Sequence, residues 1–371
     1  RIDLRSRRRW RLLRAGQMAA RVAHEVSGLA HAADAGHSAF MLPLRRAALA
    51  TPADLYIAHY PVALPAVAAA AARHGGRYAY DAEDFHLGDW PDEPGYDIER
   101  QLVRSIEGRY LPGCAHVTAA SPGVADAYAE AYGIARPCVV LNAFPLAQAS
   151  PRPTPAGAAS PGPSLYWFSQ TIGPDRGLEC AVRAIALART RPHLYLRGTP
   201  AAGYGSSLMK LAREVGATGR VRLLPPDEPD RMEELAAVYD LGLIAETGHT
   251  ASRRLCLTNK LFSFLLAGIP PLMSDTQGHR WFAKEANLLD LVYPREDATA
   301  LAQLLDGLLG DCARLSAART QAWQLGQEQY NWEREQGALV DMTERAIVIT
   351  DEGQASTLLK AHRHQCISSL K

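Results

Sequence analysis

Short apolar runs and helical patterns alternate along the first half of the chain. Apolar runs of strand length occupy 54–59, 77–80, 116–121 and 138–142, and apolar residues at helical spacing fill 18–33, 65–76 and 99–111. Runs of this length that are rich in β-branched and aromatic residues predict strands. Ser121 directly precedes Pro122, a residue favoured in the first turn of a helix, so we expect Ser121 to cap a helix.

The second half repeats this alternation more clearly. Near-continuous apolar runs lie at 165–168, 193–198, 221–224, 241–245 and 269–274, with helical patterns between them. Leu178, Ala181 and Ile185, for example, fall on one face of an expected helix over 177–188. Strands that are apolar throughout and alternate with helices predict a parallel sheet covered on both faces.

The pattern therefore predicts an α/β protein with two domains in tandem, for which 371 residues are sufficient. The segment 147–163 is rich in Pro, Ala, Ser and Gly and has no apolar period, so it predicts a linker. We expect an amino-terminal Rossmann-like domain over 1–146, a carboxy-terminal one with a terminal helix over 164–349, and a tail over 350–371.

Composition excludes several classes of protein. Hydrophobic residues make up 47% of the chain and charged residues 21%, which is typical of a folded protein with a sizeable core. The net charge of +1 gives no reason to expect nucleic-acid binding. The six cysteines are scattered and form no C-x-x-C pair, so neither a zinc site nor a disulfide framework is predicted. With no apolar run of 18 residues and no secretory signal pattern, we expect a cytoplasmic protein.

The amino end is strongly basic. Seven arginines crowd the first 14 residues, and Trp10, Leu12 and Leu13 lie among them. The segment has two interpretations: a peripheral contact with anionic lipid at the inner membrane face, or a solvated basic segment. The sequence leaves both open.

Charged residues and glycines follow the strands of the second half, where open parallel sheets bind ligands. Gly173, Arg176 and Gly177 come after the run 165–168 and favour an anion site, since glycines let the backbone approach a ligand at a helix mouth. An ordinary strand–helix turn is the alternative. Glu246 follows the run 241–245 and either accepts bonds from sugar hydroxyls or is simply solvated.

A lysine stands at the mouth of an apolar helix. Thr258 is a candidate N-cap, which places Asn259 and Lys260 in the first turn, and Gly268 ends the helix. A lysine there opposes the helix dipole, and a bound diphosphate would neutralise both. The alternative is a lysine that points to solvent.

Ionisable residues also gather after the strands of the first half. His59 ends the run 54–59, and four ionisable groups, Asp81, Glu83, Asp84 and His86, follow the run 77–80 within six residues. Such a group can bind hydroxyls or shift its members' pKa values, so we consider all five residues candidate catalytic groups. The alternative is a capping or salt-bridge loop.

These segments together resemble a known family. The stretches DLYIAH, RYAYDAEDFH, HVTAASPGVADAYAEAYG, VVLNAFPL, LYWFSQTIGPDRGLECAVRAI, TNKLFSFLLAGIPPLMSDT and NWERE are similar, in order and spacing, to family 4 glycosyltransferases of the GT-B fold. The resemblance runs from about Asp54 to Glu335. It implies two Rossmann-like domains facing a cleft, and retaining transfer of a hexosyl group without a metal or cofactor.

The resemblance also assigns roles to residues. Its carboxy-terminal domain would hold a nucleotide-sugar donor and its amino-terminal domain a glycan, lipid-linked or small-molecule acceptor. Arg176 and Lys260 would stabilise the leaving diphosphate, and such electrostatic stabilisation is usually the largest contribution to this kind of catalysis. Asn259 would lie beside the diphosphate, and the two glycines would supply backbone donors. His59 and the loop 81–86 would face the reacting sugar and the acceptor hydroxyl.

The sequence departs from the family in two places. Many members carry two glutamates with seven residues between them, for donor sugar and ribose, where this chain has Leu255 and Ser263. We expect Glu246 to supply the missing carboxylate. Members also open with a strand and a glycine-rich loop that this chain lacks, so we expect an amino-terminal domain short of its first strand or two.

Three functions fit these observations. The first is a glycosyltransferase in surface polysaccharide, glycolipid or natural-product assembly. The second is a non-catalytic relative that binds nucleotide sugars or a partner protein, which Ser263 favours. The third is a nucleotide-sugar epimerase of the same fold. Transfer of the sugar to an added acceptor would indicate the first function, binding without reaction the second, and isomerisation of the donor the third.

Overall fold

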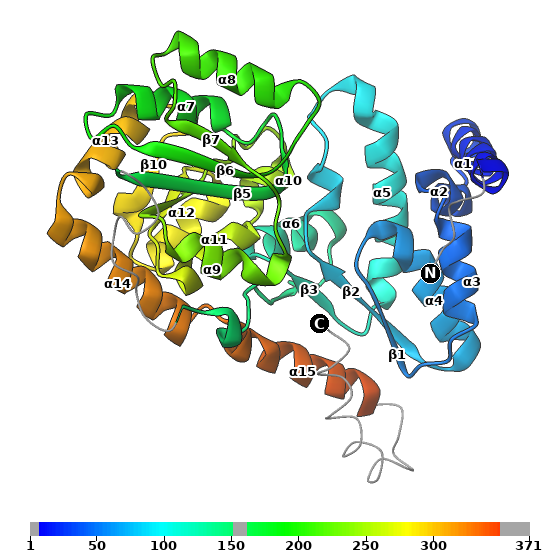
Figure 1. Ribbon diagram of the computed structural model, residues 1–371. Helices are drawn as coiled ribbons and strands as arrows, with labels where there is room; N and C mark the ends of the chain where they lie inside the picture. Colours follow the sequence, from blue (N-terminus) through cyan, green and yellow to red (C-terminus); the bar gives the residue numbers. More distant parts are fainter. Residues whose placement is uncertain (1–6, 151–161, 349–371) are drawn as a thin grey trace. The chain divides into compact units, whose positions relative to one another are not determined.

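The computed structural model describes residues 7–150 and 162–348 (Figure 1). The predicted tail, most of the predicted linker, and Arg1 and Arg5 lie outside the described residues. The described chain divides into two compact units. The first unit contains 7–119, 125–138 and 337–348, and the second contains 120–124 and 139–336. The division falls within helices α6 (Pro122–Tyr132) and α15 (Trp332–Val348) and within strand β4 (Cys138–Val139).

The first unit is built on a sheet in the order β1-β2-β3-β4. The pairs β1/β2 and β2/β3 are parallel. Its elements, besides short 3-10 turns, are α1 (Arg7–Ser27), α2 (Ala30–His37), α3 (Met41–Leu49), β1 (Leu55–Ala58), α4 (Leu64–His74), β2 (Arg77–Ala82), α5 (Asp97–Tyr110), β3 (Val117–Ala119), α6 (Pro122–Tyr132) and β4 (Cys138–Val139).

The second unit is built on a six-stranded sheet in which every neighbouring pair is parallel. Its elements are β5 (Ser164–Ile172), α7 (Leu178–Leu187), β6 (His193–Pro200), α8 (Tyr204–Glu214), β7 (Val221–Leu224), α9 (Met232–Ala237), β8 (Leu241–Ile244), α10 (Ala251–Leu255), α11 (Asn259–Ala267), β9 (Pro271–Ser274), α12 (Gln277–Glu285), β10 (Val292–Tyr293), α13 (Ala298–Leu309), α14 (Cys312–Glu328) and α15 (Trp332–Val348).

The strand order of the second unit is β10-β9-β8-β5-β6-β7. The chain therefore begins in the middle of the sheet, builds outward to β7, returns, and builds outward on the other side of β5. Because parallel crossovers are right-handed, reversing direction moves the helices to the opposite face. Figure 1 shows α7, α8 and α13 on one face and α9, α11 and α14 on the other. The order reverses between β5 and β8, which is where doubly wound sheets bind ligands.

The structure confirms the predicted alternation and refines some boundaries. Each predicted strand run contains a strand, and the Ser121 hydroxyl accepts from the Val124 amide at 3.1 Å, as expected of an N-cap. The helix expected over 18–33 is interrupted, because Gly28 adopts a left-handed φ of 63° between α1 and α2. Strand β2 continues through Ala82, so Asp81 is a strand residue rather than a loop residue. No described helix is long and apolar enough to cross a membrane.

An aromatic cluster packs helix α11 onto the sheet of the second unit. Phe264 of α11 is fully buried and makes edge-to-face contacts with Tyr166 and Phe168 of β5. Gly242 of β8 lies directly beneath it, and a Cβ atom there would approach the Phe264 ring to 2.3 Å. The helix that carries Lys260 can approach the sheet this closely because residue 242 has no side chain.

We predict that Gly242→Ala destabilises the second unit by about 3 kcal/mol, since overpacking a rigid core costs roughly 1–3 kcal/mol or more. For a unit of this size the melting temperature should fall by about 6–12 °C, measured by differential scanning calorimetry. Gly162→Ala is the matched control, because a Cβ atom there meets only the His193 side chain at 3.8 Å. Equal melting temperatures for the two variants would contradict this packing.

Candidate functional site

Three charged side chains meet where the strand order of the second unit reverses. Arg176 lies in the loop after β5, Glu246 follows β8, and Lys260 lies in the first turn of α11. A guanidinium nitrogen of Arg176 is 3.6 Å from Glu246 Oε1, and Lys260 Nζ is 3.9 Å from the same oxygen. The structure thus brings together three residues that belong to separate motifs in the sequence.

A glycine brings the loops after β5 and β8 together. Gly177 precedes α7 with a left-handed φ of 63°, and a Cβ atom there would lie 2.7 Å from the carbonyl oxygen of Ala245. Any larger residue would therefore separate Arg176 from Glu246. Gly173 has no comparable restriction, since a Cβ atom there would make only ordinary contacts with Thr171 and Ala201.

Glu246 and Lys260 are both buried, at 2% and 8% exposure. Burial alone would raise the pKa of Glu246, but the positive charges of Lys260 and Arg176 hold it below its ordinary value. Burial lowers the pKa of Lys260, and Glu246 only partly offsets this because Arg176 and Arg253 add further positive charge. These contacts exclude two alternatives left open by the sequence, a solvated Glu246 and a Lys260 that points to solvent.

Positive charge exceeds negative charge at this site. Arg176 and Lys260 both pair with Glu246, and the positive charge of Arg253 also lowers its pKa. Lys260 Nζ lies 5.4 Å from the centre of the Trp167 ring, which restricts its access to water on that side. Glu246 is one carboxylate against the two cations paired with it, which leaves a surplus that a bound anion can neutralise, and a poorly hydrated surplus attracts anions strongly.

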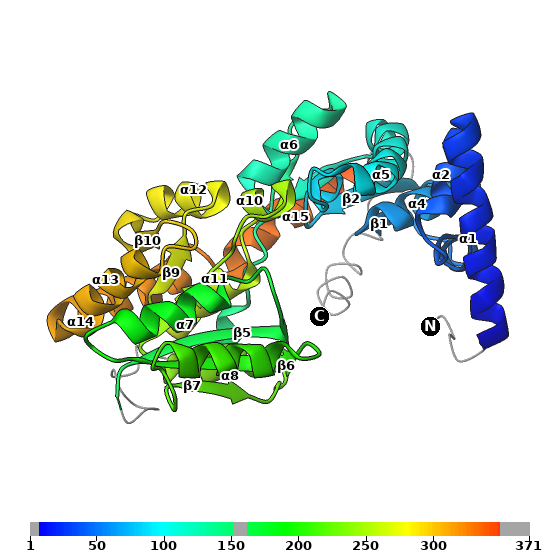
Figure 2. The same cartoon turned by 90° about the horizontal axis from the view of Figure 1, so that it is seen from above.

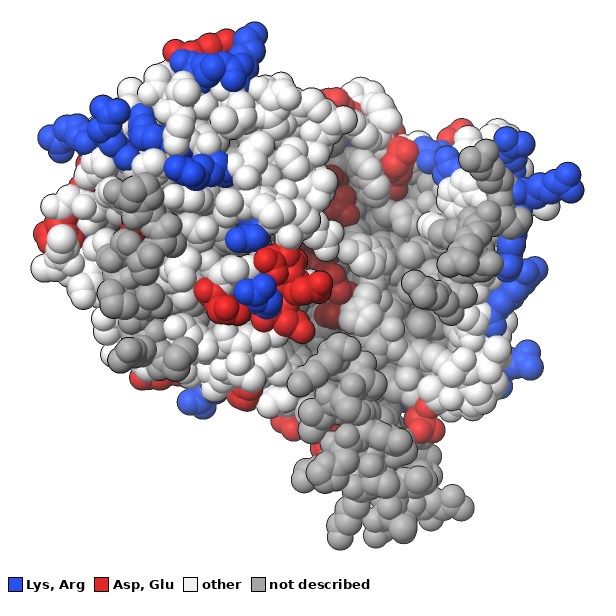
Figure 3. Space-filling view, viewed as in Figure 1, with Lys and Arg blue, Asp and Glu red and all other residues white. Residues whose placement is uncertain are grey.

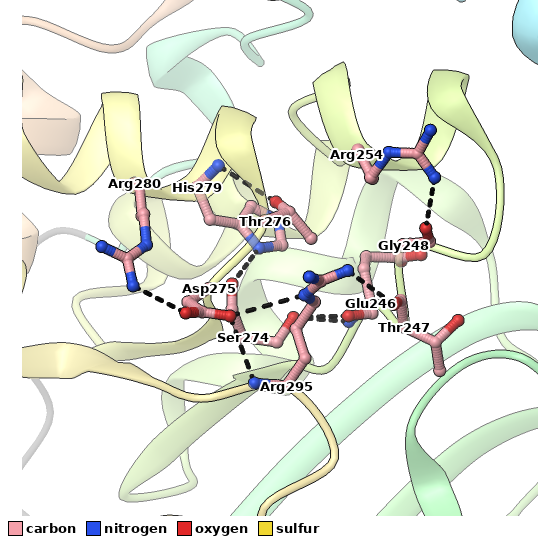
Figure 4. Close-up of polar contacts among 10 residues, drawn as sticks. All are labelled: Glu246, Thr247, Gly248, Arg254, Ser274, Asp275, Thr276, His279, Arg280 and Arg295. Carbon is pink, nitrogen blue, oxygen red and sulfur yellow. Dashed lines mark hydrogen bonds and ion pairs between the residues drawn. The ribbon is translucent and has the colours of Figure 1, made fainter.

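Strand β9 and the loops around it hold Glu246 in position (Figure 4). The Ser274 hydroxyl accepts from the Glu246 amide at 2.9 Å and donates to the Glu246 carbonyl at 2.7 Å. Farther along, Arg254 donates to the carbonyl of Gly248, and Arg295 pairs with Asp275. These contacts fix the backbone after β8, and they therefore fix the point from which the Glu246 side chain extends.

Two acceptor atoms at the site have no hydrogen-bond partner among the described residues. They are Glu246 Oε2 and Nε2 of the fully buried His279. Nδ1 of His279 lies 2.8 Å from the carbonyl oxygen of Ser274, so Nδ1 carries the hydrogen. Burial lowers the pKa of His279, which leaves Nε2 as an acceptor.

Neither His279 nor Arg253 is among the site residues that the sequence predicts. His279 lies in the first turn of α12, the helix that follows β9. That is the kind of position that singled out Lys260 in α11, so the same signal could have indicated His279. Arg253 lies within the short helix α10, where no local pattern distinguishes it from a solvated arginine.

The mouth of α11 differs in detail from the expectation. Thr258 is the N-cap residue, but its side chain makes no capping bond and its hydroxyl is buried without a partner among the described residues. Asn259 is exposed beside Lys260. Ser263, where the resembled family has a glutamate, is 1% exposed and lies beside the buried Glu233. Its hydroxyl therefore points into the core of the unit.

In the first unit, the structure groups three of the five candidate catalytic residues. His59 Nδ1 lies 3.1 Å from Asp81 Oδ2 and 3.2 Å from Glu83 Oε1. His59 and Asp81 extend the pairing of the parallel strands β1 and β2, which places their side chains together. Hydrogen bonds from the imidazole to Asp81 and Glu83 raise the pKa of His59 to about 10. Thr118 donates to the other oxygen of Asp81 at 2.6 Å.

The other two candidates lie in a different environment. His86 is buried, hydrogen-bonded to Asp89 at 2.8 Å, and packed against the ring of Tyr60 at 5.0 Å. Burial lowers the pKa of His86, but the bond to Asp89 and the nearby carboxylate charges together outweigh this and raise it overall. Asp84 accepts through its backbone carbonyl from Tyr128 at 3.3 Å.

The group of His59, Asp81 and Glu83 could also ligate a metal ion. One ligand atom from each residue lies within 4.8 Å of the others. A protonated His59 already neutralises part of the carboxylate charge, however, and a metal would have to displace that proton.

Solved structures share this arrangement of strands and helices. Anabaena HepE in complex with UDP-glucose has 18% identity and a TM-score of 0.67 over 83% of this chain and 82% of that chain. Sucrose-phosphate synthase from Thermosynechococcus elongatus has 14% identity and a TM-score of 0.67 over 86% and 79% of the two chains. A glycosyltransferase from Rickettsia africae has 13% identity and a TM-score of 0.63 over 83% and 81%.

The structural neighbours are GT-B glycosyltransferases. At these identities the similarity establishes the fold, and the expected class, two Rossmann-like parallel-sheet domains, is confirmed. No protein-family model and no curated protein sequence matches the chain.

We predict that His59 stays protonated through neutral pH and loses its proton only near pH 10. Because folding raises the pKa of His59, the protonated imidazole stabilises the folded state. This stabilisation is full below about pH 6.5 and is lost as the pH rises towards 10. Imidazole chemical shifts measured by NMR against pH should show a much lower pKa in the variant Asp81→Asn with Glu83→Gln. Asp89→Asn, which removes the partner of His86, is the control. A wild-type pKa near 6.5 for His59 would contradict the geometry.

Proposed function

We propose that this protein is a glycosyltransferase that moves a sugar from a nucleoside-diphosphate sugar to an acceptor hydroxyl. The observation that supports this most directly is the surplus positive charge of Arg176 and Lys260 over Glu246, at the strand-order reversal of a Rossmann-like sheet. A diphosphate carries the charge needed to neutralise that surplus. Structural neighbours that bind UDP and UDP-glucose agree with this choice of ligand.

Each cation has a role in departure of the diphosphate. The bond between the anomeric carbon and the diphosphate breaks, and its electron pair stays on the diphosphate. Arg176 and Lys260 lie where they can stabilise that charge in a poorly hydrated place, where electrostatic stabilisation is strongest. Backbone amides around Gly173 and Gly177 and the side chain of Asn259 would add hydrogen bonds to the phosphate oxygens.

Glu246 would bind the donor sugar as well as neutralise the cations. Both cations approach its Oε1 atom, whereas Oε2 has no partner among the described residues. The unpartnered Nε2 atom of His279 is a second acceptor. Two buried acceptors suit the hydroxyl donors of a sugar, since leaving them without hydrogen bonds has a large energetic cost. Glu246 thus takes the place of the glutamates that Leu255 and Ser263 replace.

The first unit would bind the acceptor. The group of His59, Asp81 and Glu83 is partly exposed and offers carboxylate oxygens to an acceptor hydroxyl. The hydroxyl oxygen would form the new glycosidic bond as its proton passes to one of these carboxylates. Asp84 and His86 would position this loop. We propose transfer with retention and without a metal, onto a glycan, lipid-linked or small-molecule acceptor in the cytoplasm. Surface polysaccharide, glycolipid and natural-product assembly are the pathways that need such a step.

We predict that one of UDP, GDP or ADP binds saturably to the wild-type protein, as measured by calorimetry. Arg176→Ala should weaken that binding at least tenfold, and Arg176→Ala combined with Lys260→Ala at least a hundredfold. Each lost charge-assisted hydrogen bond is worth about 1.5–3 kcal/mol. Arg183→Ala, an exposed arginine on α7, is the matched control and should bind as the wild type does.

Thermal melting of each variant shows whether it is folded, because removing Lys260 leaves Glu246 with one partner fewer. The single variant Arg176→Ala keeps the experiment informative if the double variant does not fold. A second titration in EDTA should give the same affinity. If well-folded wild-type protein bound none of the three nucleotides, the transferase proposal would be wrong.

We predict that Glu246→Gln raises the KM for the sugar donor or lowers turnover at least tenfold. Its affinity for the nucleoside diphosphate alone should not fall, because Arg176 and Lys260 lose a competing negative charge. Steady-state transfer kinetics and calorimetry measure the two effects. Glu179→Gln is the control, since that carboxylate accepts from Tyr204 at the start of α7. Unchanged KM and turnover in Glu246→Gln would rule out the role of Glu246 in sugar binding.

A further inference from the structure

Helix α1 packs against the first unit through one face. The Gln17 side chain is buried and donates to the carbonyls of Gly36 and His37, at 3.2 and 3.1 Å. A Cβ atom at Gly36 would lie 3.0 Å from the backbone of Arg21, so α1 and α2 are in close contact. Arg21 also pairs with Glu99 of α5. These contacts fix the rotation of α1 about its own axis.

The opposite face of α1 is apolar and exposed. Leu12 is 74% exposed, Met18 49%, Val22 52% and Val26 82%. At about 100° of rotation per residue, these four side chains fall within an arc of roughly 120°. The buried Gln17 lies outside that arc. The apolar stripe, defined as these four residues, therefore faces away from the unit that carries it, and Figure 2 shows α1 on the outside of that unit.

Arginines dominate the first turns of the same helix. Arg8, Arg9, Arg11 and Arg14 are exposed, and α1 contains six arginines but one acidic residue, Glu25. Figure 3 shows basic side chains over the region of the first unit where Figure 1 places α1 to α3. Trp10, among these arginines, packs on Phe40 with ring centres 5.5 Å apart. An aromatic ring with a polar N–H group is suited to the boundary between water and lipid.

We propose that α1 is a docking surface for an anionic lipid bilayer. The apolar stripe would enter the boundary between head groups and acyl chains, and the arginines would contact lipid phosphates. An apolar stripe with a cluster of arginines at one end of the same helix suits a helix that lies in the plane of a membrane. The arginines favour lipid as the occupant, because the phosphates of anionic lipid supply the negative charge that a cluster of arginines beside an apolar stripe attracts. The surface is independent of the proposed sugar transfer.

We predict that the full chain sediments with vesicles of phosphatidylcholine containing about one third phosphatidylglycerol, and that it does so at least tenfold less with phosphatidylcholine alone or at high salt. Val22→Glu combined with Val26→Glu should reduce binding to the anionic vesicles at least tenfold. Both positions are exposed, so the fold should tolerate the change. Leu187→Glu makes the same substitution at an exposed leucine of α7 and should bind as the wild type does.

Size-exclusion chromatography of the same proteins tests a second copy of the chain as the alternative occupant. A wild-type dimer that becomes monomeric in the Val22→Glu, Val26→Glu variant would overturn the lipid proposal. Failure of the wild type to bind anionic vesicles, or equal binding by wild type and variant, would also overturn it. None of these outcomes bears on nucleotide binding measured by calorimetry. Failure of the lipid proposal would therefore leave the proposed function standing.

Discussion

The candidate site of the second unit depends on the ionised carboxylate of Glu246, held in a buried position between two cations. A lysine with 8% exposure is destabilised as a cation unless a counter-ion lies nearby, and Glu246 supplies one at 3.9 Å. The carboxylate in turn stays ionised because Lys260 and Arg176 outweigh its burial. Two cations against one carboxylate leave the group with more positive than negative charge. Recognition of an anion follows from that imbalance.

The order of the strands makes this group possible. β5 and β8 are neighbours although β6 and β7 lie between them in the chain, because the chain returns to the centre of the sheet after β7. The loops that leave two adjacent strands in opposite directions open a space at the carboxyl end of the sheet. Arg176 enters this space from one loop and Glu246 from the other. The small residue Gly177 then lets the two loops touch.

A buried carboxylate in the first unit shows the contrast between a structural and a functional arrangement. Glu107 is fully buried and accepts hydrogen bonds from Tyr80, Tyr128 and Tyr132. Neutral hydroxyls satisfy its oxygens and tie α5 to β2 and α6. Glu246 keeps one oxygen without a partner among the described residues and has surplus positive charge beside it. Of these two carboxylates, Glu246 alone has unused capacity to bind a ligand.

The sequence by itself determined the elements and the residue types of the site, because local periodicity and capping chemistry are properties of neighbouring residues. It predicted the strands, the mouth of α11 with Lys260, and the cation Arg176. Tertiary structure alone decided that Glu246 is the partner of both cations and that His279 lies close to them, since these contacts join residues distant in the chain. It also buried Ser263 and directed His86 towards Asp89, because packing, which no local pattern encodes, sets the direction of each side chain.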